Sequence, residues 1–85
     1  MLFRSGHARF LRNVMIAIGN SGDPDLKASA KLALASPSPL VRGAAIWALG
    51  RLCASEEMGE MASEFGAQES DPSVAAEWRA AFLQS

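Results

Sequence analysis

Apolar residues recur along this chain at the spacing of amphipathic helices. In the first clear segment they fall at i, i+3, i+4 and i+7, namely at Leu11, Val14, Met15 and Ile18. This spacing places them on one face of a helix. The same pattern, read to the end of the chain, predicts five helices over about residues 8–20, 23–35, 39–52, 55–66 and 72–83.

Pairs of a short polar residue and a proline predict where three of these helices begin. Such a residue can cap the first free amides, and proline fits the first helical position because no hydrogen bond is lost there. The pairs are Asp23-Pro24, Ser38-Pro39 and Asp71-Pro72. Ser55 is the expected cap of the fourth helix, and Gly19 and Gly22 should end the first. In that turn Asn20 or Gly22 is expected to take a left-handed conformation.

The third predicted helix differs from the others because it is apolar nearly all round. Only Arg42 and Arg51 are plainly polar, so this helix should be central and buried. The fourth and fifth helices each carry one apolar face, formed by Met58, Met61, Ala62 and Phe65 and by Val74, Trp78, Ala81 and Phe82. Trp47 and Trp78 are both expected in the core.

One stretch of the sequence occurs twice. Residues 14–19 recur 31 positions later as residues 45–50, with alanine, an aliphatic residue and glycine in the same order, and a weaker third copy begins at Asp71. A period of just over 30 residues is typical of stacked helical hairpins. We therefore expect one all-α domain over residues 1–85, a HEAT-like or armadillo-type right-handed α-α superhelix. It should contain about two and a half hairpins and end half a repeat short.

Composition points to a soluble protein of the cytoplasm. No apolar run approaches the roughly 20 residues that a bilayer crossing needs, and the first residues lack the apolar centre of a signal peptide. The single cysteine, Cys53, excludes an internal disulfide and favours a reducing compartment.

The residues needed for catalysis or metal binding are scarce. His7 is the only histidine and Cys53 the only cysteine, so the chain offers no metal cage and no Cys–His pair. Glu56, Glu60 and Glu64 recur at i, i+4 and i+8, as in a solvated helix face. We therefore expect neither enzyme activity nor a bound cofactor or metal.

Charge is unevenly distributed, although the formal net charge is only −1. Residues 1–54 hold seven Lys or Arg against two Asp, and the remainder holds one Arg against seven Asp or Glu. In a stack of helices, Arg9, Arg12, Lys27, Lys31 and Arg42 could align as a basic ridge for a phosphate backbone. Two alternatives stay open: ordinary solvated helix faces, and for Arg42 a brace to an acid between hairpins, such as Asp23.

Two segments carry a resemblance to a known family. Leu-Arg-Asn-Val at residues 11–14 and Pro-Leu-Val-Arg-Gly-Ala-Ala-Ile-Trp-Ala-Leu-Gly at residues 39–50 resemble the C-terminal helical repeat region of bacterial epoxyqueuosine reductases. The resemblance covers about residues 9–52 and fades towards the end. It implies a parent protein that completes queuosine in tRNA in the cytoplasm, using cobalamin and two iron-sulfur clusters.

The chain has neither the cysteine array nor the cobalamin domain of that family, so we expect an excised or naturally separate repeat domain. The resemblance implies that tRNA and the catalytic domains of a parent enzyme are partners. Arg12, Asn13, Arg42 and Arg51 match the family pattern, which makes Asn13 a further candidate for RNA contact.

The alternative function is a protein interaction scaffold that uses the open face or an open end of the stack. In that case the unpaired fifth helix would leave Val74, Trp78 and Phe82 partly uncovered and support weak self-association. No membrane partner is expected.

Overall fold

Five α-helices and two short 3₁₀ turns form this protein in a computed structural model, which describes the backbone of residues 2–84 and the side chains of residues 6–81. The helices are α1 (Leu2–Ser21), α2 (Lys27–Ala33), α3 (Pro39–Leu52), α4 (Ser55–Phe65) and α5 (Pro72–Gln84). The turns are η1 (Pro24–Leu26) and η2 (Gly66–Gln68). No strand occurs within residues 2–84. The predicted all-α class and the five helices are confirmed.

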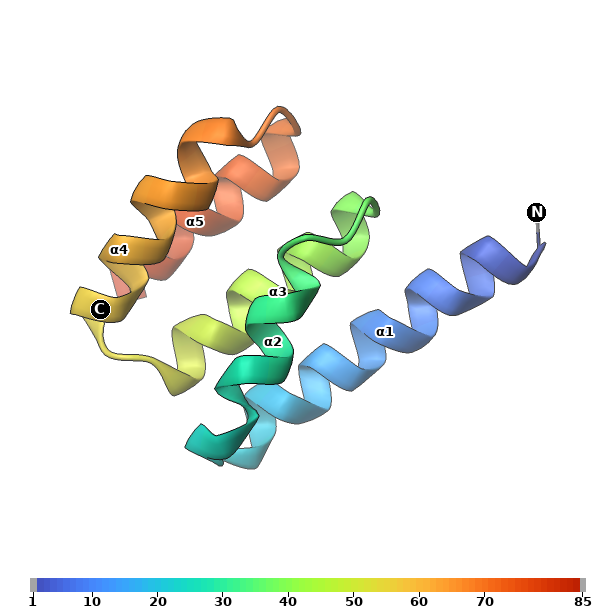
Figure 1. Cartoon of the computed structure of the whole chain (residues 1–85), viewed down its shortest axis with the longest axis horizontal. Helices are drawn as coiled ribbons and strands as arrows, with labels where there is room; N and C mark the ends of the chain where they lie inside the picture. The colour runs from blue at the N-terminus through green and yellow to red at the C-terminus, as the bar shows by residue number, and fades with distance from the viewer. Residues whose placement is uncertain (1, 85) are drawn as a thin grey trace.

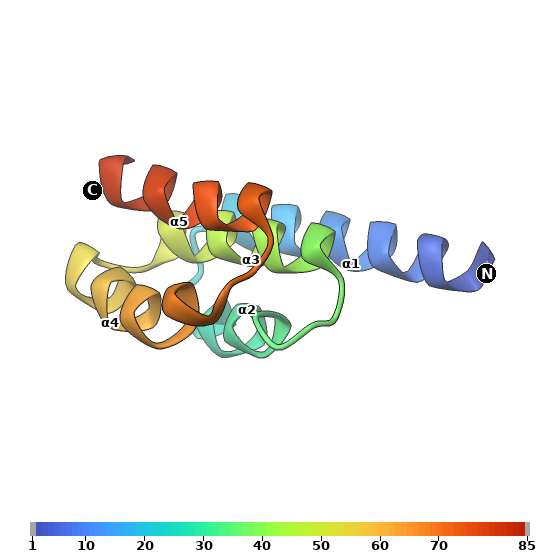
Figure 2. The ribbon, with the colours of Figure 1, turned by 90° about the horizontal axis from the view of Figure 1, so that it is seen from above.

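The helices lie in two layers of unequal size. Helices α1, α3 and α5 lie side by side in one layer, and α2 and α4 pack against one side of it (Figures 1 and 2). Helix α3 is the middle member of the larger layer and contacts all four other helices. None of the described helices has the length and apolar character that a membrane crossing requires.

Helix α3 supplies most of the core, as its nearly uniform apolar sequence predicts. Its buried side chains are Val41, Ala45, Ile46, Ala48 and Leu49. Met15 and Ile18 of α1 pack against this cluster from one side, and Met58 and Met61 of α4 pack against it from another. The central position of α3 therefore follows from its sequence: a helix that is apolar on all sides is stable only when other helices cover each side.

Several predicted helix ends are confirmed in detail. Asp23 Oδ1 accepts a hydrogen bond from the Asp25 amide at 2.9 Å, and Asp71 Oδ1 accepts one from the Ser73 amide at 2.9 Å. Gly22 has a φ of 68°, so of the two residues proposed for the left-handed position the glycine takes it. Ser38 stands at the N-cap of α3, but its hydroxyl caps no amide.

Several helix boundaries and one cap differ from the predictions. Helix α1 begins at Leu2 instead of near residue 8, and it continues through Gly19, which was expected to end it, to Ser21. The second helical segment opens as the 3₁₀ turn η1 and ends at Ala33 instead of residue 35. Ser55 is the first residue of α4 and not its cap: Ala54 holds the N-cap, and Glu57 Oε1 accepts the Ala54 amide at 3.2 Å. Glu57 thus forms one half of a capping box, because it accepts the amide of the N-cap residue, whereas a serine cap would accept an amide of the first turn.

The two tryptophans have different environments. Trp78 is buried and belongs to the core cluster, whereas Trp47 is half-buried at its edge, contrary to the expectation that both are core residues. Val74 is also buried. The expectation that α5 leaves Val74 and Trp78 uncovered is therefore wrong, because α5 lies against α3 and also contacts α4. Phe82 lies outside the residues whose side chains are described.

Candidate functional site

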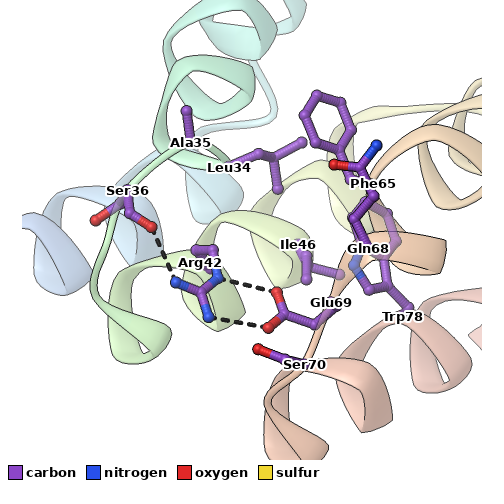
Figure 3. A pocket seen from close by; sticks show the side chains of 10 residues that line it. All are labelled: Leu34, Ala35, Ser36, Arg42, Ile46, Phe65, Gln68, Glu69, Ser70 and Trp78. Carbon is purple, nitrogen blue, oxygen red and sulfur yellow. Dashed lines mark hydrogen bonds and ion pairs between the residues drawn. The ribbon is translucent and has the colours of Figure 1, made fainter.

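Arg42, a member of the predicted basic ridge, is held by three hydrogen bonds. Its Nε and Nη2 donate to the two carboxylate oxygens of Glu69, each at 2.9 Å, and its Nη1 donates to the Ser36 carbonyl at 3.0 Å (Figure 3). The side chains are only 19% and 7% exposed for Arg42 and Glu69 respectively. Arg42 thus ties the start of α3 to the loop before it and to the segment that precedes α5.

The charges of this pair stabilise each other. The hydrogen bond from Arg42 is the main cause that lowers the pKa of Glu69, and the Asp71 amide lowers that pKa further by donating to Glu69 Oε2. The same bond to Glu69 raises the pKa of Arg42. Arg42 therefore acts as a brace between α3 and the segment before α5, and its partner is Glu69 and not the suggested Asp23. Asp23 is too far for that role because it caps the turn at the opposite end of α2.

A cavity of about 270 Å³ surrounds this ion pair (Figure 3). Its described lining consists of Leu34, Ala35, Ser36, Arg42, Ile46, Phe65, Gln68, Glu69, Ser70 and Trp78. The only charged groups in this lining, Arg42 and Glu69, already bind each other.

Lys27, a second member of the predicted ridge, also forms an ion pair. Its Nζ lies 3.1 Å from Glu57 Oε1 and joins α2 to α4. The pKa of Glu57 is lowered, first by the hydrogen bond from the Ala54 amide and then by the bond from Lys27. Lys31, one turn further along α2, is exposed.

The remaining candidates lie on α1. Arg9 and Asn13 are exposed and Arg12 is half-buried, and Arg12 makes only long hydrogen bonds to Asn13 Oδ1, at 3.3 and 3.4 Å. Helical spacing puts these three residues on one side of α1. Lys31 belongs to α2 in the other layer (Figure 2). The structure thus brings together Arg9, Arg12 and Asn13, separates them from Lys31, and uses Lys27 and Arg42 within the fold.

Arg51 joins α1 to α3 at a close contact. Its Nε donates to the Gly19 carbonyl at 3.1 Å, and its guanidinium carbon lies 5.3 Å from the centre of the Trp47 ring. A Cβ atom on Gly19 would stand 2.5 Å from Trp47 Cζ3, so only glycine allows this approach. In the sequence, this close contact is signalled only by the recurrence of glycine at positions 19 and 50. That recurrence does not reveal which side chain packs on which glycine.

An apolar groove, which the sequence reasoning missed, crosses the larger layer. It has a volume of about 460 Å³ and is lined by residues of α1, α3 and α5: Arg12, Ile16, Pro39, Leu40, Gly43, Ala44, Trp47, Ser73, Val74 and Glu77. Ile16 and Leu40 are 39% and 43% exposed. The α1-α3-α5 groove could not be found from helical periodicity, because that pattern predicts apolar residues to be buried.

A second apolar groove, of about 790 Å³, lies between α1, α2 and the start of α3. Its residues include His7, Leu11 and Leu32, the last of which is 79% exposed. Within the described residues no group of three His, Cys, Asp or Glu side chains is placed to hold a metal ion. Cys53 is a free, half-buried thiol whose pKa is raised, chiefly by burial.

The chain matches no family model, no curated protein and no solved structure.

Proposed function

We propose that this chain is a non-catalytic helical-repeat domain that helps to hold tRNA beside a catalytic unit in queuosine biosynthesis. The proposal extends the resemblance to the C-terminal region of epoxyqueuosine reductases. The observation that carries it is the basic side of α1, where Arg9, Arg12 and Asn13 remain accessible while Arg42 and Lys27 hold the fold together.

Within this proposal the two layers are the outer and inner helices of a HEAT-like right-handed superhelix. Three observations support that type: the sequence period of just over 30 residues, the alternation of helices between two layers, and an arginine that bridges consecutive repeats. The cellular setting that we propose is the cytoplasm, where a free cysteine stays reduced.

The chemistry of α1 suits a phosphate backbone. Arginine binds phosphate through its planar fork, and an exposed asparagine can add a hydrogen bond. Only two cations of this side of α1, Arg9 and Arg12, are available, so binding should be weak and should lose roughly 12-fold in affinity between about 50 and 200 mM salt.

The test is a titration of a labelled tRNA anticodon stem-loop and of an unrelated hairpin, followed by fluorescence anisotropy at low and physiological salt. Arg12→Glu should weaken binding at least tenfold. Arg79→Glu makes the same change in net charge on α5 and is the matched control, which should bind nearly as well as the natural chain. Equal losses in both variants, or no saturable binding at low salt, would refute RNA binding by α1. Arg42 is unsuitable for this test because its replacement removes the brace.

A second candidate function is protein docking on the open face of the stack. The specific observation in its favour is that Ile16 and Leu40 are exposed within one groove, instead of being scattered singly over the surface. Because Val74 and Trp78 are buried, this candidate no longer depends on the end of α5.

A further inference from the structure

The α1-α3-α5 groove has an apolar floor on α3, between α1 on one side and α5 on the other. Leu40, Ala44 and Trp47 contribute the floor from α3, and Ile16 adds to it from α1. Gly43 keeps the floor low because it carries no side chain. Grooves of this size accept a few large apolar side chains from a partner and remove them from water.

The two edges of the groove carry opposite charges. Arg12 stands on the α1 side, and Glu77 stands on the α5 side, next to Gly43. Arg9 lies one turn before Arg12 and adds positive charge to the same edge. A partner with a uniform charge would therefore be attracted by one edge and repelled by the other.

Neither edge is neutralised within the protein. The ion pairs among the described residues are Lys27–Glu57 and Arg42–Glu69, and neither involves Arg12 or Glu77. Both side chains are half-buried, where a charge-assisted contact is screened less by salt than at a fully exposed position. The two charges are thus available to a molecule that enters the groove.

We propose that the α1-α3-α5 groove binds an amphipathic α-helix of a partner protein. The apolar stripe of that helix packs on Leu40, Trp47 and Ile16, its acidic flank faces Arg12, and its basic flank faces Glu77. This inference rests on the second candidate function and specifies the partner for it. Helices that dock in this way use anchors at i, i+3 or i+4, and i+7.

The opposite edges also fix the direction of the bound helix. If the helix is turned end for end, its acidic flank meets Glu77 and its basic flank meets Arg12, so both contacts become repulsive. The short groove makes a weak complex, with a Kd on the order of 10–100 µM.

The test uses the full chain and labelled synthetic peptides of about 18 residues, long enough to form a helix. All carry the same leucine stripe. One peptide has glutamate along one flank and lysine along the other, and a second has lysine along both flanks. Fluorescence anisotropy should show saturable binding of the mixed-flank peptide, at least fivefold tighter than binding of the all-lysine peptide.

Variants of the chain locate the site and its charge preference. Leu40→Glu should weaken binding of the mixed-flank peptide at least tenfold, whereas Leu32→Glu, with the same change in net charge in the other groove, should change it less than twofold. Arg12→Glu cancels the positive charge of the α1 edge, because a glutamate then stands beside Arg9, so the preference for the mixed-flank peptide over the all-lysine peptide should be lost. Circular dichroism checks that each variant keeps its helix content.

Several results would overturn the inference. Absence of binding at millimolar peptide would do so, as would greater sensitivity to Leu32→Glu than to Leu40→Glu, which would move protein docking to the groove beside α2. Concentration-dependent dimers that Leu40→Glu abolishes would make a second copy of the chain the occupant. If Leu40→Glu weakened stem-loop binding and no peptide bound, the groove would belong to RNA. Loss of RNA binding alone would refute the tRNA proposal and leave this inference intact.

Discussion

Gly19 shows how one missing side chain sets the distance between two helices. A Cβ atom at this position would lie 2.5 Å from the Trp47 ring and 3.1 Å from Ala48 Cα. Helix α1 therefore rests directly on the indole, and the Gly19 carbonyl stays within reach of Arg51 Nε. The glycine is required by packing, because α1 is helical here and needs no unusual backbone angle.

Gly19→Ala should lower the stability of the protein. Alanine normally favours a helix over glycine by about 1 kcal/mol, but overpacking against an indole and backbone costs about 1–3 kcal/mol. We expect a net loss of about 1 kcal/mol in the free energy of unfolding, measured by urea denaturation. Gly6→Ala, in the same helix but with open space around the added carbon, is the control and should not destabilise. Equal effects of the two changes would contradict the packing argument.

The Arg42–Glu69 pair predicts how stability depends on pH. The pKa of Glu69 in the folded protein lies below the ordinary value of 4.5. Near pH 4.5 the unfolded chain therefore binds more protons than the folded protein. The contribution of Glu69 is therefore complete above about pH 5.5 and is lost as pH falls through 4.5 towards the folded-state pKa. Glu57 and Asp71 shift in the same direction and add to the effect.

Glu69→Gln tests this contribution directly. At pH 7 we expect a loss of about 1–3 kcal/mol, because Arg42 keeps a hydrogen-bond acceptor but loses its counter-charge. The difference between the natural chain and the variant should shrink as pH falls from 4.5 towards the lowered folded-state pKa of Glu69, because the unfolded chain then gains a proton that the folded protein resists. Urea denaturation at several pH values measures the difference in the free energy of unfolding. A difference that does not change with pH would show that the stabilisation by this pair is not electrostatic.

Among the elements, α3 determines the stability of the fold because every other helix packs against it. Leu49→Ala, in the buried part of α3, should cost about 2–5 kcal/mol. Leu32→Ala removes the same atoms from a residue that is 79% exposed and should cost less than about 0.5 kcal/mol. Similar losses at both positions would mean that α2 is more deeply packed than described.

The helices could be predicted because local chemistry marks most of their ends. The bounds of α3 match the prediction, since Pro39 opens the helix and its apolar run defines the body. The early start of α1 was not predicted, because the apolar stripe that marks this helix in the sequence begins only at Leu11. Ser55 was predicted as the cap of α4, but Ala54 holds that position. Which residue becomes the cap depends on where the loop after Cys53 joins the helix.

The candidate site was harder to predict because it depends on contacts between distant residues. A bracing role for Arg42 was one of the roles predicted, but its pairing with Glu69 depends on how the chain after the turn η2 returns to α3. Sequence placed Arg12 and Lys31 on one ridge, although their helices belong to different layers. The groove was not anticipated, because periodicity does not tell whether a neighbouring helix covers Ile16 and Leu40.

At the scale of the whole molecule, α5 closes one side of α3. A chain that ends at residue 70 would keep Glu69 but lose Val74 and Trp78, and would expose the part of α3 that they cover. We expect this shortened chain to show a lower melting temperature by circular dichroism and a broader transition, since an 85-residue domain has little core to spare. An unchanged melting temperature would mean that the first four helices fold independently.

The different positions of the two tryptophans give the molecule two intrinsic optical reporters. Trp78 is a buried residue of α5 that packs into the core, so its emission should be blue-shifted and should change mainly when the protein unfolds. Trp47 lines the α1-α3-α5 groove beside the Arg51 cation, so its emission should respond to whatever enters that groove. In a Trp78→Phe chain that stays folded, the emission of Trp47 would report binding in the α1-α3-α5 groove without an attached dye. In a Trp47→Phe chain the same binding should leave the emission unchanged.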